Sequence, residues 1–211
     1  MDKSIEPIIP SITISHDDDP NVMGDAYVRA YEASQARSLI DRSMWHIACN
    51  SVTCGNCGHQ NRTFEASPCV SLPINATTIF STSGGMLTLE DCLAASERGT
   101  FAPEYICDVG CKMKSRNTVH AVSVQHASDI FVIHLKRFET AVSVVNNKTI
   151  SSTFKIQTAI DFPVDEQLEL HTHNDNKTLS YELFAVCHHI GSKLTSGHYI
   201  STCKNPVNGL W

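Results

Sequence analysis

The stretch from Tyr181 to Trp211, YELFAVCHHIGSKLTSGHYISTCKNPVNGLW, decides the fold. Its first eight residues, 181–188, are mostly apolar and predict a buried type of strand. A loop over residues 191–197 leads into a second strand over residues 198–203. The dipeptide Asn208-Gly209 then predicts a two-residue hairpin turn just before Trp211.

His198 is the histidine in this stretch that could carry chemistry. It follows Ser196 and Gly197 at the junction of loop and strand, so the strand start fixes the direction of its imidazole. The other histidines at the end of the first strand, His188 and His189, are expected to be structural. A Gly-His-Tyr triplet alone does not distinguish a catalytic histidine from a structural one.

Other apolar segments predict further strands. Residues 129–138 are apolar on both faces in their first half, so we expect this strand to lie centrally in a sheet. Residues 154–162 predict another strand, and the polar residues 142–152 predict a hairpin or loop. Extended segments are also expected over residues 43–50 and 62–74.

Two segments predict helices. Thr88 and Asp91 form a capping-box pattern that should open a short helix over residues 89–96. Residues 25–41 predict a longer helix, and residues 1–22 are expected to form a loosely ordered leader in which Asp19-Pro20 signals a turn or helix start. The longer helix is indicated by residues at near-helical spacing, namely Ala26, Ala30, Ala33, Ala36 and Ile40.

Two close cysteine pairs indicate a metal site. Cys54 and Cys57 form one pair, and Cys107 and Cys111 form the other, each in a polar turn that contains glycine. Tetrahedral zinc is commonly bound by two such turns, each presenting two thiolates. The spacing therefore favours a structural zinc ion bound by these four residues.

Other interpretations of the cysteines stay open at this point. The pairs could be unrelated free thiols or a redox pair, although a redox Cys-x-x-Cys normally opens a helix after a strand. His59 is a possible substitute ligand. The remaining five of the nine cysteines lie in apolar or alternating contexts and are expected to be small buried side chains.

Composition narrows the classes of function. The chain has 211 residues, a formal net charge of -6 and an ordinary globular share of apolar residues, 42%. Nucleic acid is not an expected partner, because duplex binding usually needs a basic excess. No segment has the length of apolar residues that a membrane span or signal peptide requires, so we expect no membrane association and a location in the cytoplasm, the nucleus or both. In those compartments paired cysteines more often bind metal than form disulfides.

The ordered series of these segments resembles the catalytic domain of ubiquitin-specific proteases, from about Trp45 to Trp211. Residues 181–191, the tetrapeptide Ser196–Tyr199 and Trp211 are similar to the histidine box of that family. Residues 131–138 are similar to the strand signature that precedes it. Four other segments follow the family pattern in the same order: residues 64–74, 87–93, 154–156 and 161–163.

The resemblance implies an α+β fold, namely part of a papain-like cysteine peptidase with the hand shape of ubiquitin-specific proteases. Residues 23–211 would form this partial catalytic domain. Antiparallel zinc-ribbon fingers would cover about residues 45–125, and an antiparallel palm sheet would cover about residues 126–211. Ubiquitin and ubiquitinated proteins would be the partners.

The resemblance also implies a mechanism. In this family a cysteine attacks the carbonyl after the terminal glycine of ubiquitin, a histidine deprotonates the thiol, and an aspartate or asparagine orients the histidine. His198 matches the general base, and Cys54, Cys57, Cys107 and Cys111 match the zinc ligands. The family's cysteine box has no match, and its third triad residue usually lies shortly after the tryptophan matched by Trp211.

Three hypotheses follow. The first is a deubiquitinating cysteine protease of which this chain is a truncated part, inactive alone. The second is a pseudoenzyme that binds ubiquitin without cleaving it. The third is a zinc-stabilised interaction module unrelated to ubiquitin. We favour the first, because His198 is present and the chain stops within an expected hairpin.

Overall fold

The computed structural model describes residues 20–34, 39–74, 86–102, 105–145, 148–173 and 177–211. These residues form two compact units, each described here by itself. Unit 1 comprises Met1–Val70, Ala95–His134 and His171–Leu179, and unit 2 comprises Ser71–Ala94, Leu135–Leu170 and Ser180–Trp211. Residues 1–19 of the expected leader lie outside the described part, and the expected bounds of leader, fingers and palm stay predictions.

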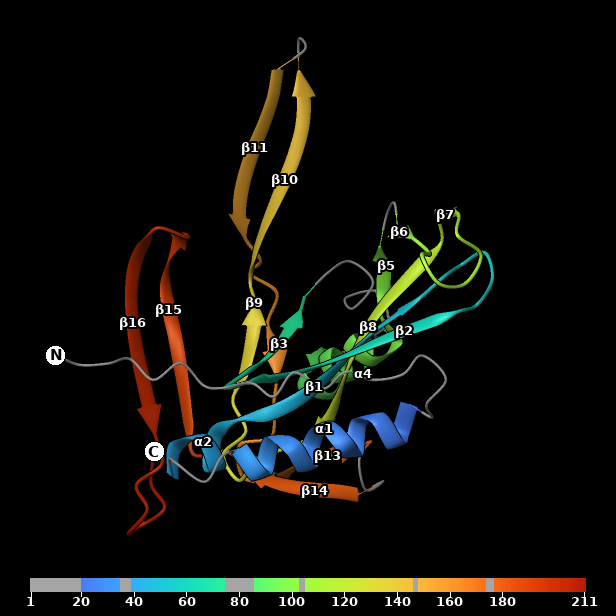
Figure 1. The fold of residues 1–211 in the computed structure, drawn as a ribbon. Helices are drawn as coiled ribbons and strands as arrows, with labels where there is room; N and C mark the ends of the chain where they lie inside the picture. The colour runs from blue at the N-terminus through green and yellow to red at the C-terminus, as the bar shows by residue number, and fades with distance from the viewer. Residues whose placement is uncertain (1–19, 35–38, 75–85, 103–104, 146–147, 174–176) are drawn as a thin grey trace, which may run out of the picture. The chain divides into compact units, whose positions relative to one another are not determined.

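Unit 1 is built around one antiparallel sheet with the strand order β2-β1-β8-β5 (Figure 1). β1 pairs with β2 on one side and with β8 on the other, with a register shift between Ile47 and Ala48. A separate pair, β6 and β7, is also antiparallel. The elements are α1 (Pro20–Ser34), α2 (Leu39–Met44), β1 (His46–Thr53), β2 (Gln60–Ser67), β5 (Thr100–Ala102), β6 (Tyr105–Ile106), β7 (Lys114–Ser115) and β8 (Thr118–His126).

Helix α1 packs on this sheet through its aromatic residues. It begins at Pro20, which fits the first turn of a helix because proline lacks an N–H that would be unbonded there. Tyr27, Val28 and Tyr31 are buried with Ile47 of β1. The helix expected over residues 25–41 is present in its first part as α1, which begins earlier, at Pro20. Its packing face is formed by large side chains such as Tyr27 and Tyr31, which bury more apolar area than alanines do.

Unit 2 consists mainly of hairpins. β10 pairs with β11 and β15 pairs with β16, both antiparallel (Figure 1). The short β12 is parallel to β4. The predicted hairpin over residues 142–152 is confirmed, as part of the longer β10–β11 pair. The elements are β4 (Leu87–Thr88), β10 (Phe138–Val145), β11 (Lys148–Lys155), β12 (Ile160–Asp161), β15 (Ala185–Lys193) and β16 (Ser196–Cys203).

The remaining elements contain residues of both units: α4 (Leu89–Arg98), β3 (Val70–Pro73), β9 (Ile133–Lys136), β13 (Gln167–Thr172) and β14 (Lys177–Glu182). The capping box that opens α4 is confirmed. Asp91 donates its backbone N–H to Thr88 Oγ1 at 3.1 Å, and Asp91 Oδ2 accepts the backbone N–H of Thr88 at 3.0 Å. The two residues thus satisfy each other's free backbone donors.

Two predictions about strands were wrong. Residues 129–138 contain the short strand β9 and the first residue of β10, and β9 lies in a two-stranded sheet with β3 and has no fully buried residue. Residues 181–188 were expected to form one buried strand, but they divide between β14 and β15, and no residue of β15 is fully buried. Apolar composition predicts extended structure, whereas burial depends on which elements cover the strand.

None of the helices within the described ranges is both long enough and apolar enough to cross a bilayer.

Candidate functional site

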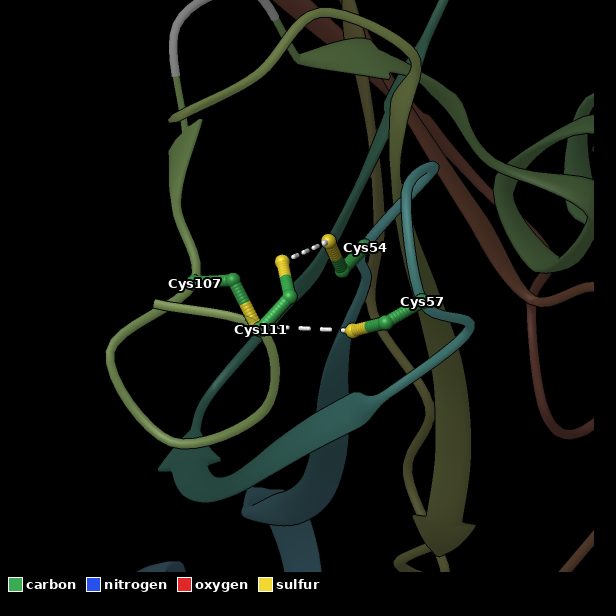
Figure 2. Close-up of side chains that lie close together, drawn as sticks. All are labelled: Cys54, Cys57, Cys107 and Cys111. Carbon is green, nitrogen blue, oxygen red and sulfur yellow. Dashed lines mark hydrogen bonds between the residues drawn. The ribbon is translucent and has the colours of Figure 1, made fainter. Parts of the chain in front are cut away.

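The first cysteine pair lies in the turn between β1 and β2. Cys54 donates its backbone N–H to the carbonyl of His59 at 2.8 Å, and Gly58 donates its N–H to the carbonyl of Cys54 at 2.9 Å. Gly58 has a φ of 73°, a left-handed conformation that glycine adopts without a steric penalty. These bonds bend the chain tightly, so that both thiols of the pair point to one side (Figure 2).

The second pair lies in the turn between β6 and β7, also in unit 1. Cys107 donates its N–H to the carbonyl of Met113 at 3.1 Å. A Cβ added to Gly110 would lie 2.8 Å from Cys57 Sγ and 2.9 Å from Cys107 Sγ, so a larger residue would displace both sulfurs. The two turns are joined directly, because the Gly55 N–H donates to Ser115 Oγ at 3.1 Å.

The four sulfur atoms form a compact cluster (Figure 2). All four lie within 4.8 Å of one another, with Cys54 and Cys111 at 3.9 Å and Cys57 and Cys107 at 3.8 Å. A tetrahedral zinc ion with bonds of about 2.3 Å to sulfur requires sulfur atoms about 3.8 Å apart. The cluster therefore fits a closed structural zinc site. It contains the four predicted cysteines without His59.

Electrostatics at the cluster favour a cation. Backbone hydrogen bonds from Cys57 and Asn56 lower the pKa of Cys54 to about 6, so that this sulfur is readily a thiolate. At Cys111 a hydrogen bond from the backbone of Met113 acts in the same direction, but burial and the neighbouring Cys57 and Cys54 sulfurs outweigh it and raise the pKa. Four thiolates can coexist at these distances when a divalent cation offsets their repulsion.

The geometry does not fit the redox interpretation. Cys54 and Cys57 lie in a turn between two strands, whereas the reactive cysteine of a redox pair normally lies at the start of a helix. In addition, each of these sulfurs is close to a sulfur of the other turn, at 3.9 and 3.8 Å. Clustering of both pairs is what a shared metal ion requires.

His198 lies in unit 2, near the start of β16 and exposed. It is opposite Ile190 of β15 in the antiparallel register. Gly191, just beyond that partner, has a φ of 133° and begins a register shift before the turn to β16. The sequence analysis placed His198 at the junction of a loop and a strand, but β15 and β16 extend further, and His198 is the third residue of β16. The catalytic role of His198 stays a prediction.

Unit 2 contains three cysteines in addition to His198, namely Cys92, Cys187 and Cys203. Burial raises the pKa of Cys92 to about 11, the opposite of what a nucleophilic thiol needs. Cys187 and Cys203 lie on β15 and β16, but strand alternation places them on the face opposite to His198. In unit 1, burial also raises the pKa of Cys49.

Sequence reasoning assigned no role to Lys155 at the end of β11. Its ammonium contacts the ring and backbone of His189 on β15, which lies 34 residues later in the chain. The available signal was the match of residues 154–156 to the family pattern. His188, in contrast, is exposed and lines a shallow apolar hollow of about 140 Å³ together with Trp211, and its structural role stays a prediction.

Comparisons with known proteins agree with the resemblance. Residues 21–211 match the family described as ubiquitin carboxyl-terminal hydrolase. The chain is 29% identical over 198 residues to rat ubiquitin carboxyl-terminal hydrolase 21, a match that covers 90% of the chain and 31% of that protein. The human protein of the same name is 28% identical over 196 residues, with the same coverage. The chain thus spans about a third of the length of these relatives.

Solved structures show the same fold. A structure of the yeast SAGA DUB module superposes with a TM-score of 0.59 at 20% identity, over 86% of this chain and 38% of that chain. A SAGA DUB module bound to ubiquitin aldehyde superposes with a TM-score of 0.56 at 19% identity, over 86% and 40%. The predicted α+β, papain-like fold of the ubiquitin-specific proteases is confirmed by these neighbours. Together with the match over residues 21–211, they show that the chain belongs to the ubiquitin carboxyl-terminal hydrolase family, within its ubiquitin-specific protease branch.

Proposed function

We propose that this chain is the fingers-and-palm part of a deubiquitinating cysteine protease, which hydrolyses the bond after the C-terminal glycine of ubiquitin. The observation that carries the proposal is the family match over residues 21–211, which contains both the cysteine cluster and the His198 strand. A neighbour of the same fold holds ubiquitin aldehyde, which supports ubiquitin as the partner. The protein would act in the cytoplasm, the nucleus or both, where thiols stay reduced.

The cysteine cluster would hold a structural zinc ion. Cys54, Cys57, Cys107 and Cys111 complete a tetrahedral site by themselves, which leaves no open position for substrate. The ion would therefore join the β1–β2 turn to the β6–β7 turn and would not take part in the reaction. Its contribution is to folding, because metal binding and folding are coupled in such sites.

His198 would act as the general base of the protease. A cysteine thiol needs an adjacent imidazole to become a thiolate, and that imidazole needs a partner on its other nitrogen. This chain would supply the imidazole, and residues outside it would supply the nucleophile and the orienting side chain. The chain alone is therefore expected to bind ubiquitin without hydrolysing a ubiquitin conjugate.

Zinc content and ubiquitin binding test the first half of the proposal. Reduced chain purified without chelator should contain about one zinc ion per molecule and should bind ¹⁵N-labelled ubiquitin in an NMR titration. Cys107→Ser should lose both properties, whereas Cys203→Ser, which changes an exposed cysteine outside the cluster, should keep both. Absence of zinc from the unmodified chain would contradict the metal assignment.

Hydrolysis tests the second half. In the full-length protein, His198→Ala should lower the rate of cleavage of a ubiquitin–lysine bond by several orders of magnitude while ubiquitin binding persists. His188→Ala, on the neighbouring strand, is the matched control and should stay active. An active His198→Ala protein would remove His198 from the mechanism. A full-length protein without a cysteine box would instead indicate a ubiquitin-binding pseudoenzyme.

A further inference from the structure

We infer that Lys155 is a positioning residue for His198, and that it acts through the side chain of His189. The inference rests on the proposed function, because positioning matters only if His198 is the general base. The residues that carry it all belong to unit 2 and are called here the Lys155 cluster: Phe138, Lys155, His189 and Tyr199.

The Lys155 ammonium uses all of its hydrogen-bonding capacity on β15. It lies 2.6 Å from the carbonyl oxygen of His189, 3.0 Å from the carbonyl oxygen of Gly191 and 3.1 Å from His189 Nδ1. A lysine ammonium has three N–H donors, and each has an acceptor here. An exposed lysine that is merely solvated would not be arranged in this way, and Lys155 is half-buried.

These bonds fix the state of the His189 ring. An ammonium can only donate, so His189 Nδ1 must accept, and the ring proton lies on Nε2. The ring is also held on both sides by aromatic neighbours. Its centroid lies 5.5 Å from that of Phe138, in an edge-on arrangement, and 4.9 Å from that of Tyr199.

The cluster constrains both neighbours of His198 in the chain. Tyr199 follows His198 and contacts the His189 ring. Gly197 precedes His198, and a Cβ added there would lie 2.2 Å from His189 Nε2, so the ring occupies the space directly above this glycine. His198 therefore lies between Gly197 and Tyr199, and both of these residues lie against the His189 ring.

The cluster also constrains the partner strand of His198. Ile190 lies opposite His198 in the register, and the two carbonyls that Lys155 binds belong to the residues on either side of Ile190. Lys155 thus holds the backbone of β15 at the residue that pairs with His198. The side chain of His198 itself lies on the other face of the hairpin, by strand alternation, where it stays accessible. This arrangement orients an imidazole without covering it, which is what a general base requires.

NMR of the 211-residue chain tests the inference without depending on catalysis. Long-range ¹H–¹⁵N spectra should show one His189 tautomer, with the proton on Nε2, and coupling constants should show one χ1 rotamer for His198. Lys155→Met should lose both signatures while the β10–β11 hairpin signals persist. Lys148→Met, which removes a lysine from the other end of the same strand, is the matched control and should keep both.

A second variant and a kinetic measurement complete the test. His189→Phe keeps a ring between Phe138 and Tyr199 but removes the acceptor, so it should also release the His198 rotamer if Lys155→Met does not fold. In the full-length protein, Lys155→Met should lower kcat by about ten- to a hundredfold with little change in KM, as expected for misplacement of a reacting group. Unchanged His198 signals in a folded Lys155→Met or His189→Phe chain would overturn the inference. A full-length His198→Ala protein that stays active, together with altered His198 signals in the Lys155→Met chain, would overturn only the proposed function.

Discussion

Mild acid should destabilise unit 1 through a single buried histidine, His46 at the start of β1. The side chain is 1% exposed, its Nδ1 has no hydrogen-bond partner, and its ring packs edge-on against Phe131 at a centroid distance of 5.6 Å. Burial, with a smaller contribution from His126, lowers the pKa of His46 from 6.5 to about 4. Protonation inside the folded unit would place a charge where neither water nor a hydrogen-bond acceptor compensates it.

The sign and size of the effect follow from this shift. Between pH 6.5 and about 4 the unfolded chain binds more protons than the folded chain, so stability falls as the pH falls through this window. A shift of this size corresponds to about 3 kcal/mol in total, of which about 2 kcal/mol should be lost between neutral pH and about pH 5. Above pH 6.5 the contribution is fully present.

Urea unfolding at neutral pH and at about pH 5 measures this loss of stability. The contribution of other acid-sensitive groups is subtracted by comparison with a variant that lacks the His46 imidazole. In a Trp211→Phe background, Trp45 is the one remaining tryptophan, and its fluorescence reports on unit 1, where it lies next to His46 in the chain. His46→Leu has similar volume and no proton to bind, so it should be nearly neutral at pH 7 because it leaves no unpaired polar atom. The unmodified chain should lose about 2 kcal/mol more than this variant on acidification. Equal losses in the two proteins would refute the argument.

Three further predictions rest on other contacts. Cys107→Ser or a strong chelator should lower the Tm of unit 1 by separating the two cysteine turns, as followed by calorimetry; an unchanged Tm would argue against a bound ion. Thr88→Ala should destabilise α4 by about 1 kcal/mol in urea unfolding, since it removes the hydroxyl that caps the N–H of Asp91. Gly197→Ala should displace the His189 ring and cost about 1–3 kcal/mol, because the new methyl would overlap the ring; unperturbed His189 NMR signals would contradict this.

Local patterns predicted the parts of the structure that depend on neighbours in the chain. The capping box at Thr88 and the start of α1 near Pro20 are both confirmed, since each is formed within a few residues. The strand predicted over residues 129–138 was too long, and the buried strand predicted over 181–188 was divided. In both cases an apolar run was taken as a sign of burial, and burial is decided by distant elements.

The sequence by itself determined the family and the members of the cysteine cluster. The spacing of Cys54 and Cys57 fits a tight turn, as does that of Cys107 and Cys111, because backbone hydrogen bonds within a few residues close each turn. Only the tertiary structure showed that the four sulfur atoms meet within 4.8 Å. Only the tertiary structure showed the contact between Lys155 and His189, which are 34 positions apart, because that contact depends on how two hairpins pack against each other. Spacing along the chain encodes a turn, whereas the hydrogen bonds that orient His198 exist only once β11 and β15 are side by side.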